Sequence, residues 1–190
     1  MDTFEVRYNQ LAQQILAMGM QATKAYNDAQ AELQLELVLS PDRLCCEEGI
    51  RASRDTLDRF EALTSAHKEA FSKFLIAATG RLGEVIAEMP EEKARAHRAS
   101  LAASVNRSLQ GQARSYVLRE EWLSTARRVC ELLEDCRDVI EFRDGQFLFF
   151  EDEPMEEFNA LLARIDELHR LEVENVEERL SAWRNGPATC

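Results

Sequence analysis

The sequence predicts a mainly α-helical fold, an elongated antiparallel bundle of about four long helices with a short β-hairpin inserted near residues 139–150. Three observations support this prediction. Apolar residues recur every three or four positions along most of the chain, as they do on one face of a helix. Only 7 Gly and 4 Pro occur in 190 residues, so little interrupts long elements. One stretch alone, EFRDGQFLFFEDEP, reads as strands and a turn rather than as helix. We expect one domain over residues 1–190.

The first two helices are expected over about residues 3–38 and 41–89. Between them stand Ser40, a good N-cap residue, and Pro41, which suits the first helical position because a missing N–H costs nothing there. The second helix carries a seven-residue, coiled-coil-like repeat, which favours packing against neighbouring helices. Its two apolar rows contain Ile50, Leu57, Thr64, Phe71, Ala78 and Val85, and Ser53, Phe60, His67 and Phe74. Gly80 and Gly83 predict a kink near its end.

The last two helices are expected over about residues 90–138 and 153–184. Met89-Pro90 starts the third helix and places two acidic residues in its first turn, where the helix dipole favours them. Gly111, flanked by polar residues, predicts a break within it. The fourth helix starts at Glu153-Pro154 and ends at a Gly-Pro stop signal.

The hairpin prediction depends on Asp144-Gly145, because a type I′ turn needs positive φ at both central residues. That turn places Phe142 opposite Phe147. Counting outward by twos gives one apolar face, made of Ile140, Phe142, Phe147 and Phe149. A two-stranded hairpin is marginal alone, so we expect this face to pack on the helices or on a partner.

The net charge of −12 is unevenly distributed along the chain. Residues 131–190 carry 17 acids against 6 arginines, a net −11, whereas residues 93–128 carry 8 basic residues against 2 acids, a net +6. This pattern predicts that a basic helix packs beside an acidic one. A strongly acidic total argues against nucleic acid or an anionic membrane as the partner.

The location expected for the protein is cytoplasmic. The sequence lacks an apolar run of 18 residues, and its first ten residues have neither the basic nor the apolar region of a secretory signal. The five cysteines are an odd number, with Cys45 and Cys46 adjacent, which favours reduced thiols. Arginine outnumbers lysine 19 to 4, from which we hypothesise a bacterial or phage origin.

The sequence predicts no catalytic residue, metal site or cofactor. His67 lies in an apolar row of the second helix, where the best interpretation is a packed histidine. Asp166 and His169 are three residues apart on one helix face, but the two Glu-x-x-His motifs of a di-iron bundle are missing. Cys45-Cys46, expected in the first turns of the second helix, is not a Cys-x-x-Cys redox pair and is interpreted as inert. Phosphate-loop and nucleophile-elbow motifs are also missing.

We therefore hypothesise a non-enzymatic intracellular protein that binds another protein, of the inhibitor, immunity or adaptor type. The partner is expected to have a basic surface, since apolar anchors rimmed by charge are typical of binding patches. The predicted binding residues follow the turn: Phe147, Leu148, Phe150, Glu151, Asp152, Glu153, Glu156 and Glu157. One alternative is a helical enzyme that uses His67 or His169 with nearby carboxylates. Another is a homodimeric scaffold joined by exposed apolar hairpins or heptads.

Overall fold

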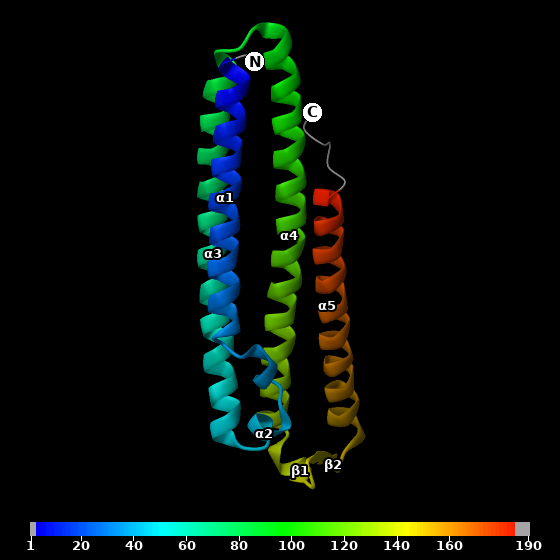
Figure 1. Ribbon diagram of the computed structural model, residues 1–190. Coiled ribbons are helices and arrows are strands. Elements are labelled where there is room, and N and C mark those ends of the chain that lie inside the picture. The colour runs from blue at the N-terminus through cyan, green and yellow to red at the C-terminus, as the bar shows by residue number, and fades with distance from the viewer. Residues whose placement is uncertain (1–2, 185–190) are drawn as a thin grey trace. The chain divides into compact units, whose positions relative to one another are not determined.

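Four long helices and one two-stranded β-hairpin make up the chain in the computed structural model, which describes residues 3–184 (Figure 1). The predicted fold class, a mainly helical bundle with a hairpin near the C-terminus, is confirmed. The long helices are α1 (Thr3–Ala31), α3 (Glu47–Ala87), α4 (Glu91–Asp135) and α5 (Asp152–Arg184). The shorter elements are η1 (Leu35–Leu37), α2 (Pro41–Leu44), η2 (Arg137–Val139), β1 (Ile140–Arg143) and β2 (Gln146–Phe149).

The described residues form two compact units, and α3 and α4 each pass from one into the other. The α1 unit contains residues 3–30 and 63–112. The hairpin unit contains residues 31–62 and 113–184. The single domain expected over residues 1–190 stays a prediction.

The α1 unit is closed at one end by an apolar cluster around the turn between α3 and α4. Its buried members are Val85, Ile86, Met89 and Ala94, against which Phe4, Tyr8, Leu11 and Leu101 pack. Further along, α1 lies beside α3, with Gly19 against the Phe74 ring and the Tyr26 hydroxyl 3.4 Å from the Thr64 hydroxyl (Figure 1). Residues later in α1 contact residues earlier in α3, so the two helices are antiparallel, as predicted.

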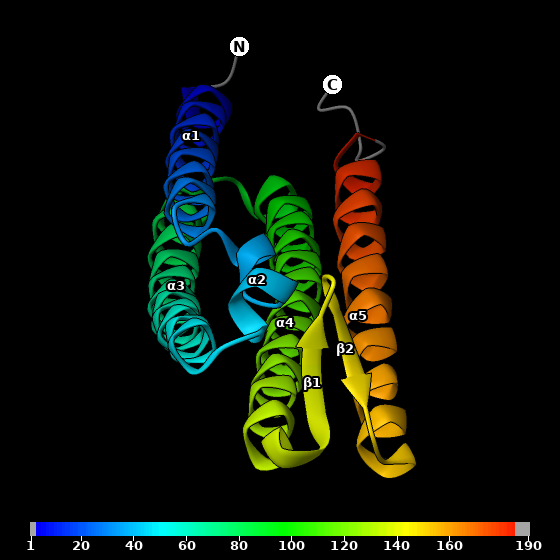
Figure 2. The same cartoon turned by 90° about the horizontal axis from the view of Figure 1, so that it is seen from below.

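In the hairpin unit, α5 lies beside α4, and the hairpin connects their neighbouring ends (Figure 2). Arginines and glutamates cross between the two helices. Arg128 Nε is 2.7 Å from Glu157 Oε1, Arg119 Nε is 3.1 Å from Glu172 Oε1, and Arg114 Nη1 is 2.8 Å from Glu178 Oε2. Residues later in α5 pair with residues earlier in α4, so these two helices are also antiparallel. The prediction that a basic helix packs beside an acidic one is therefore confirmed for α4 and α5.

The heptad rows predicted in the second helix form a buried face of α3. Leu57 and Ser53 are fully buried, and Phe60 is 2% exposed. Phe60 meets the Trp122 ring edge-on, with 5.9 Å between ring centroids. Ser53 can be buried because its hydroxyl donates a hydrogen bond of 2.7 Å to the Val38 carbonyl oxygen.

Three expected helix boundaries are wrong. The first helix ends at Ala31 rather than near 38, because Gln34 adopts a left-handed conformation with φ of 51°. Leu33 and Val38 are nevertheless buried, so apolar spacing continues into a connection that is not helical. The second helix is divided at residues 45 and 46 into α2 and α3. The third helix ends at Asp135 rather than 138, because the 3₁₀ turn η2 follows it.

The glycines expected to disturb α3 and α4 do not interrupt them. Gly80 and Gly83 lie inside the continuous helix α3, and Gly111 lies inside α4. A single glycine costs a helix about 1 kcal/mol relative to alanine, which tertiary packing offsets in helices of this length.

Ser40 is the N-cap of α2 with Pro41 at its first position, as expected. The Ser40 hydroxyl, however, donates to the Leu37 carbonyl oxygen at 2.8 Å rather than capping α2.

Candidate binding surface

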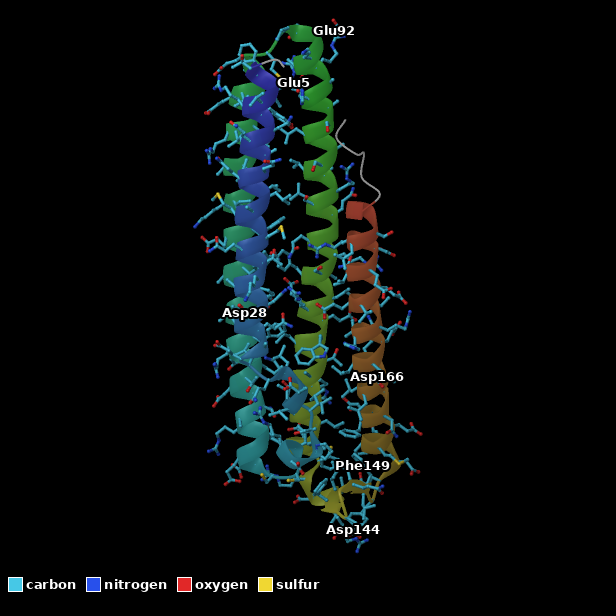
Figure 3. All side chains as sticks on the ribbon, in the orientation of Figure 1. Glu5, Asp28, Glu92, Asp144, Phe149 and Asp166 are labelled. Carbon is cyan, nitrogen blue, oxygen red and sulfur yellow. The ribbon has the colours of Figure 1, made fainter. Side chains whose placement is uncertain are left out.

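The hairpin has the predicted turn and register. Asp144 and Gly145 have φ of 53° and 81°, and Phe142 pairs with Phe147 across the strands. Figure 3 shows Asp144 at the turn of the hairpin and Phe149 on the side toward the helices. Both central turn residues thus adopt the left-handed conformation that a type I′ turn requires.

One face of the hairpin packs on the first turns of α5 through aromatic contacts. The Phe158 ring, on a side chain 7% exposed, lies with its centroid 5.5 Å from that of Phe147 and 5.3 Å from that of Phe149. Phe142 completes the cluster at 5.0 Å from Phe147. The structure therefore places Phe147, one of the predicted binding residues, in the contact that holds the hairpin to α5.

Phe150 differs from these phenylalanines because its ring points into solvent. Its side chain is 66% exposed, whereas its backbone N–H donates a hydrogen bond of 2.9 Å to the Val139 carbonyl oxygen. That bond closes the base of the hairpin and fixes the backbone at position 150. Leu148, also a predicted binding residue, is half-buried.

Acidic side chains surround Phe150 on the chain that enters α5. Glu151, Asp152, Glu153 and Glu156 are all exposed, and within residues 3–184 none of the four forms an ion pair. Asp152 and Glu153 stand in the first turn of α5, where the helix dipole stabilises negative charge. We call this surface the acidic aromatic edge, made of Phe150, Glu151, Asp152, Glu153, Met155 and Glu156.

Glu157, also a predicted binding residue, is engaged within the protein. Its carboxylate accepts a hydrogen bond of 2.7 Å from Arg128 Nε, and this bond is the main reason why the pKa of Arg128 is raised. Arg128 also lies 3.7 Å from Glu131 and 3.9 Å from Asp135. Glu157 thus helps to hold α5 on α4 rather than contributing free charge to the acidic aromatic edge.

The histidines occupy packed or exposed positions. His67 is half-buried and stacks on Tyr26, with ring centroids 4.1 Å apart. His169 and Asp166 are both exposed on α5. Within the part of the chain that the structure describes, no group of three or more side chains is arranged to hold a metal ion.

A cluster around His97 in the α1 unit was not anticipated from the sequence. The His97 ring lies 4.4 Å from that of Tyr8, and its Nε2 atom is 3.4 Å from Glu5 Oε2. Lys93 Nζ approaches the other carboxylate oxygen at 3.7 Å. Burial and the Glu5 charge raise the pKa of Tyr8. No sequence signal indicates this cluster, because α1 and α4 are far apart in the chain.

Polar side chains are also buried between α4 and α5. The Asn175 side-chain amide donates a hydrogen bond of 2.8 Å to Ser115 Oγ, and both residues are at most 2% exposed. Arg179 Nη1 donates to the same oxygen at 3.2 Å. Burial, together with the nearby Arg119 charge, lowers the pKa of Arg179. These bonds fix the position of α5 along α4.

Comparisons of the chain with protein-family models, curated proteins and solved structures found no match. Among the described residues, the helices are all too polar or too short in their apolar runs to cross a membrane.

Proposed function

We propose that this protein binds another protein through the acidic aromatic edge, as an inhibitor, immunity protein or adaptor does, and that its partner has a basic surface. The observation that carries the proposal is the Phe150 ring, 66% exposed on a fixed backbone beside four acids that form no ion pair with any described residue. Burying a side chain of this size against a partner contributes about 1.5–3 kcal/mol relative to leaving it exposed.

The backbone at position 150 supports binding because it needs little ordering when a partner arrives. The hydrogen bond to Val139 and the aromatic packing on Phe158 hold the base of the hairpin in place. Preorganised groups lose less entropy on association than mobile ones. The unpaired acids would mainly attract a basic partner and orient it, since charges at the rim of an interface act on association rate and specificity.

Capture of partners by immobilised protein tests the proposal, with wild type compared with Phe150→Ser. Loss of a central aromatic anchor costs about 2 kcal/mol or more, so we expect roughly 30-fold weaker capture of the specific partner. Val117→Ser is the matched control, because Val117 is 59% exposed on α4 and lies outside the acidic aromatic edge. Glu153→Gln/Glu156→Gln should weaken capture at low salt and have less effect at high salt. Equal capture by Phe150→Ser and Val117→Ser would refute the proposal.

Self-association is a second candidate function, favoured by an exposed apolar stripe on α5. Val173, Val176 and Leu180 are 44%, 42% and 49% exposed and are spaced by three and four residues, as on one helix face. Two copies could bury these stripes against each other in coiled-coil fashion. Light scattering at several concentrations should then give a dimer for the wild type and a monomer for Val176→Lys. A strict monomer for the wild type at every concentration would exclude this function.

A further inference from the structure

The adjacent cysteines lie at the corner between α2 and α3 rather than inside a helix. Helix α2 ends at Leu44 and α3 begins at Glu47, so Cys45 and Cys46 are the two connecting residues, and both are exposed. The corner is tight: a Cβ atom at Gly49 would lie 1.9 Å from the Arg43 carbonyl oxygen. The backbone that carries the two thiols is therefore held by direct contact between α2 and the first turn of α3.

The Cys45 thiol is hydrogen-bonded to the backbone, and its pKa is raised. Cys45 Sγ donates a hydrogen bond of 3.2 Å to the Asp42 carbonyl oxygen. Partial desolvation, then the Cys46 neighbour and the Asp42 charge, raise the pKa of Cys45. A protonated thiol is a weak nucleophile, so Cys45 is poorly suited to rapid oxidation. Two thiols on neighbouring residues suit a ligand that bonds to both sulfurs.

Both thiols border a cavity of about 200 Å³ in the hairpin unit. It is open to solvent on one side, and the apolar half of its wall comes from α3, the end of α4 and the hairpin, including Ile50, Leu133, Ile140 and Phe147. Glu47 and Arg137 also line it and are paired with each other at 3.2 Å. An apolar cavity of about 150 Å³ is large enough for benzene. The thiols are thus placed beside space for one aromatic ring.

We propose that Cys45 and Cys46 form a dithiol site for a trivalent thiophilic metalloid that carries an aromatic group, an aryl arsenical being the type compound. An aryl arsenic(III) oxide would react with both thiols, forming two As–S bonds as the As=O bond breaks. The two thiol protons join the oxide oxygen and leave as water, and arsenic stays trivalent. The aromatic group would occupy the cavity. This site is independent of the acidic aromatic edge.

Phenylarsine oxide tests the dithiol in a Cys136→Ser/Cys190→Ser background, which leaves Cys45, Cys46 and the buried Cys130. We expect one equivalent to bind, to resist excess 2-mercaptoethanol and to be released by 1,2-ethanedithiol. Further replacement by Cys45→Ser or Cys46→Ser should make the bound arsenical at least tenfold easier for the monothiol to remove. Cys130 is an internal control, because burial raises its pKa to about 11 and should block alkylation until the chain unfolds. Equal release from the background protein and the single-serine variants would overturn the proposal.

The cavity is tested separately from the thiols. Ile140→Trp should fill part of it and weaken phenylarsine oxide binding about tenfold while leaving arsenite, which has no aromatic group, unchanged. Circular dichroism checks that this variant keeps its helices. In the wild type, which needs no substitution, saturating toluene should compete with phenylarsine oxide but not with arsenite. If toluene affects neither probe or both alike, the cavity does not hold the aromatic group and the proposal is wrong.

Discussion

At the scale of single residues, Gly49 is required by one backbone contact. A Cβ atom there would lie 1.9 Å from the Arg43 carbonyl oxygen, closer than packed atoms approach, and a backbone atom cannot move aside as a flexible side chain can. At Gly80, in the same helix, a Cβ atom would have no neighbour within 4 Å. Glycine is therefore needed at position 49 for close packing and is not needed at position 80. The sequence alone does not distinguish the two positions.

We predict opposite effects of alanine at these two positions. Gly49→Ala should lower the free energy of unfolding by about 1–3 kcal/mol, because α2 must move away from α3. Gly80→Ala should raise it by up to about 1 kcal/mol, because alanine favours the helix and meets no neighbour. Urea denaturation followed by circular dichroism measures both. A Gly49→Ala protein as stable as the wild type would show that the corner is not tight.

Phe147 and Phe150 show how far the binding residues could be predicted. The Asp-Gly turn is a local signal, so the pairing of Phe142 with Phe147 and the shared apolar face followed from the sequence. The contact of that face with Phe158 depends on how α5 is placed against the hairpin. The local sequence pattern does not determine that placement. The sequence therefore predicts Phe147 at a binding surface, whereas Phe150 alone among the predicted aromatic residues is exposed there.

At the scale of elements, the position of α5 on α4 depends on a buried polar contact. Ser115→Ala should remove the acceptor of the Asn175 amide and leave that buried group unsatisfied, lowering the free energy of unfolding by about 1–3 kcal/mol. Ser108→Ala, at an exposed position of the same helix, should change it by less than about 0.5 kcal/mol. Thermal and urea denaturation compare the two. Equal stability of both variants would mean that Ser115 does not hold α5 in register.

The elements that could be predicted are those with local signals, namely the start of α2 at Ser40-Pro41, the start of α4 after Pro90 and the hairpin turn. Two breaks could not be predicted. The break after Ala31 occurs at Gln34, a residue with no strong turn preference, within an apolar pattern that continues through buried Leu33 and Val38. The division at Cys45 and Cys46 is accompanied by the close contact of Gly49 with Arg43, a packing feature that local sequence pattern does not reveal.

At the scale of the whole molecule, the uneven charge has two consequences. Part of the acidic excess of residues 131–190 is used internally, since Glu157, Glu172 and Glu178 pair with arginines of α4. The acids of the acidic aromatic edge are not used in this way among the residues described. The structure therefore distinguishes acids that hold helices together from acids available to a partner. Composition alone does not show which acids belong to each group.

The most direct test of the binding proposal is photo-crosslinking in cells from a photoreactive phenylalanine analogue at position 150, with the same analogue at position 117 as the control. We predict one protein with a basic surface that crosslinks from position 150 and not from position 117. When the crosslinking is repeated in lysate, its yield should fall as the ionic strength rises. Crosslinks that are absent from position 150, identical from both positions, or made only to a second copy of this chain would contradict the proposal.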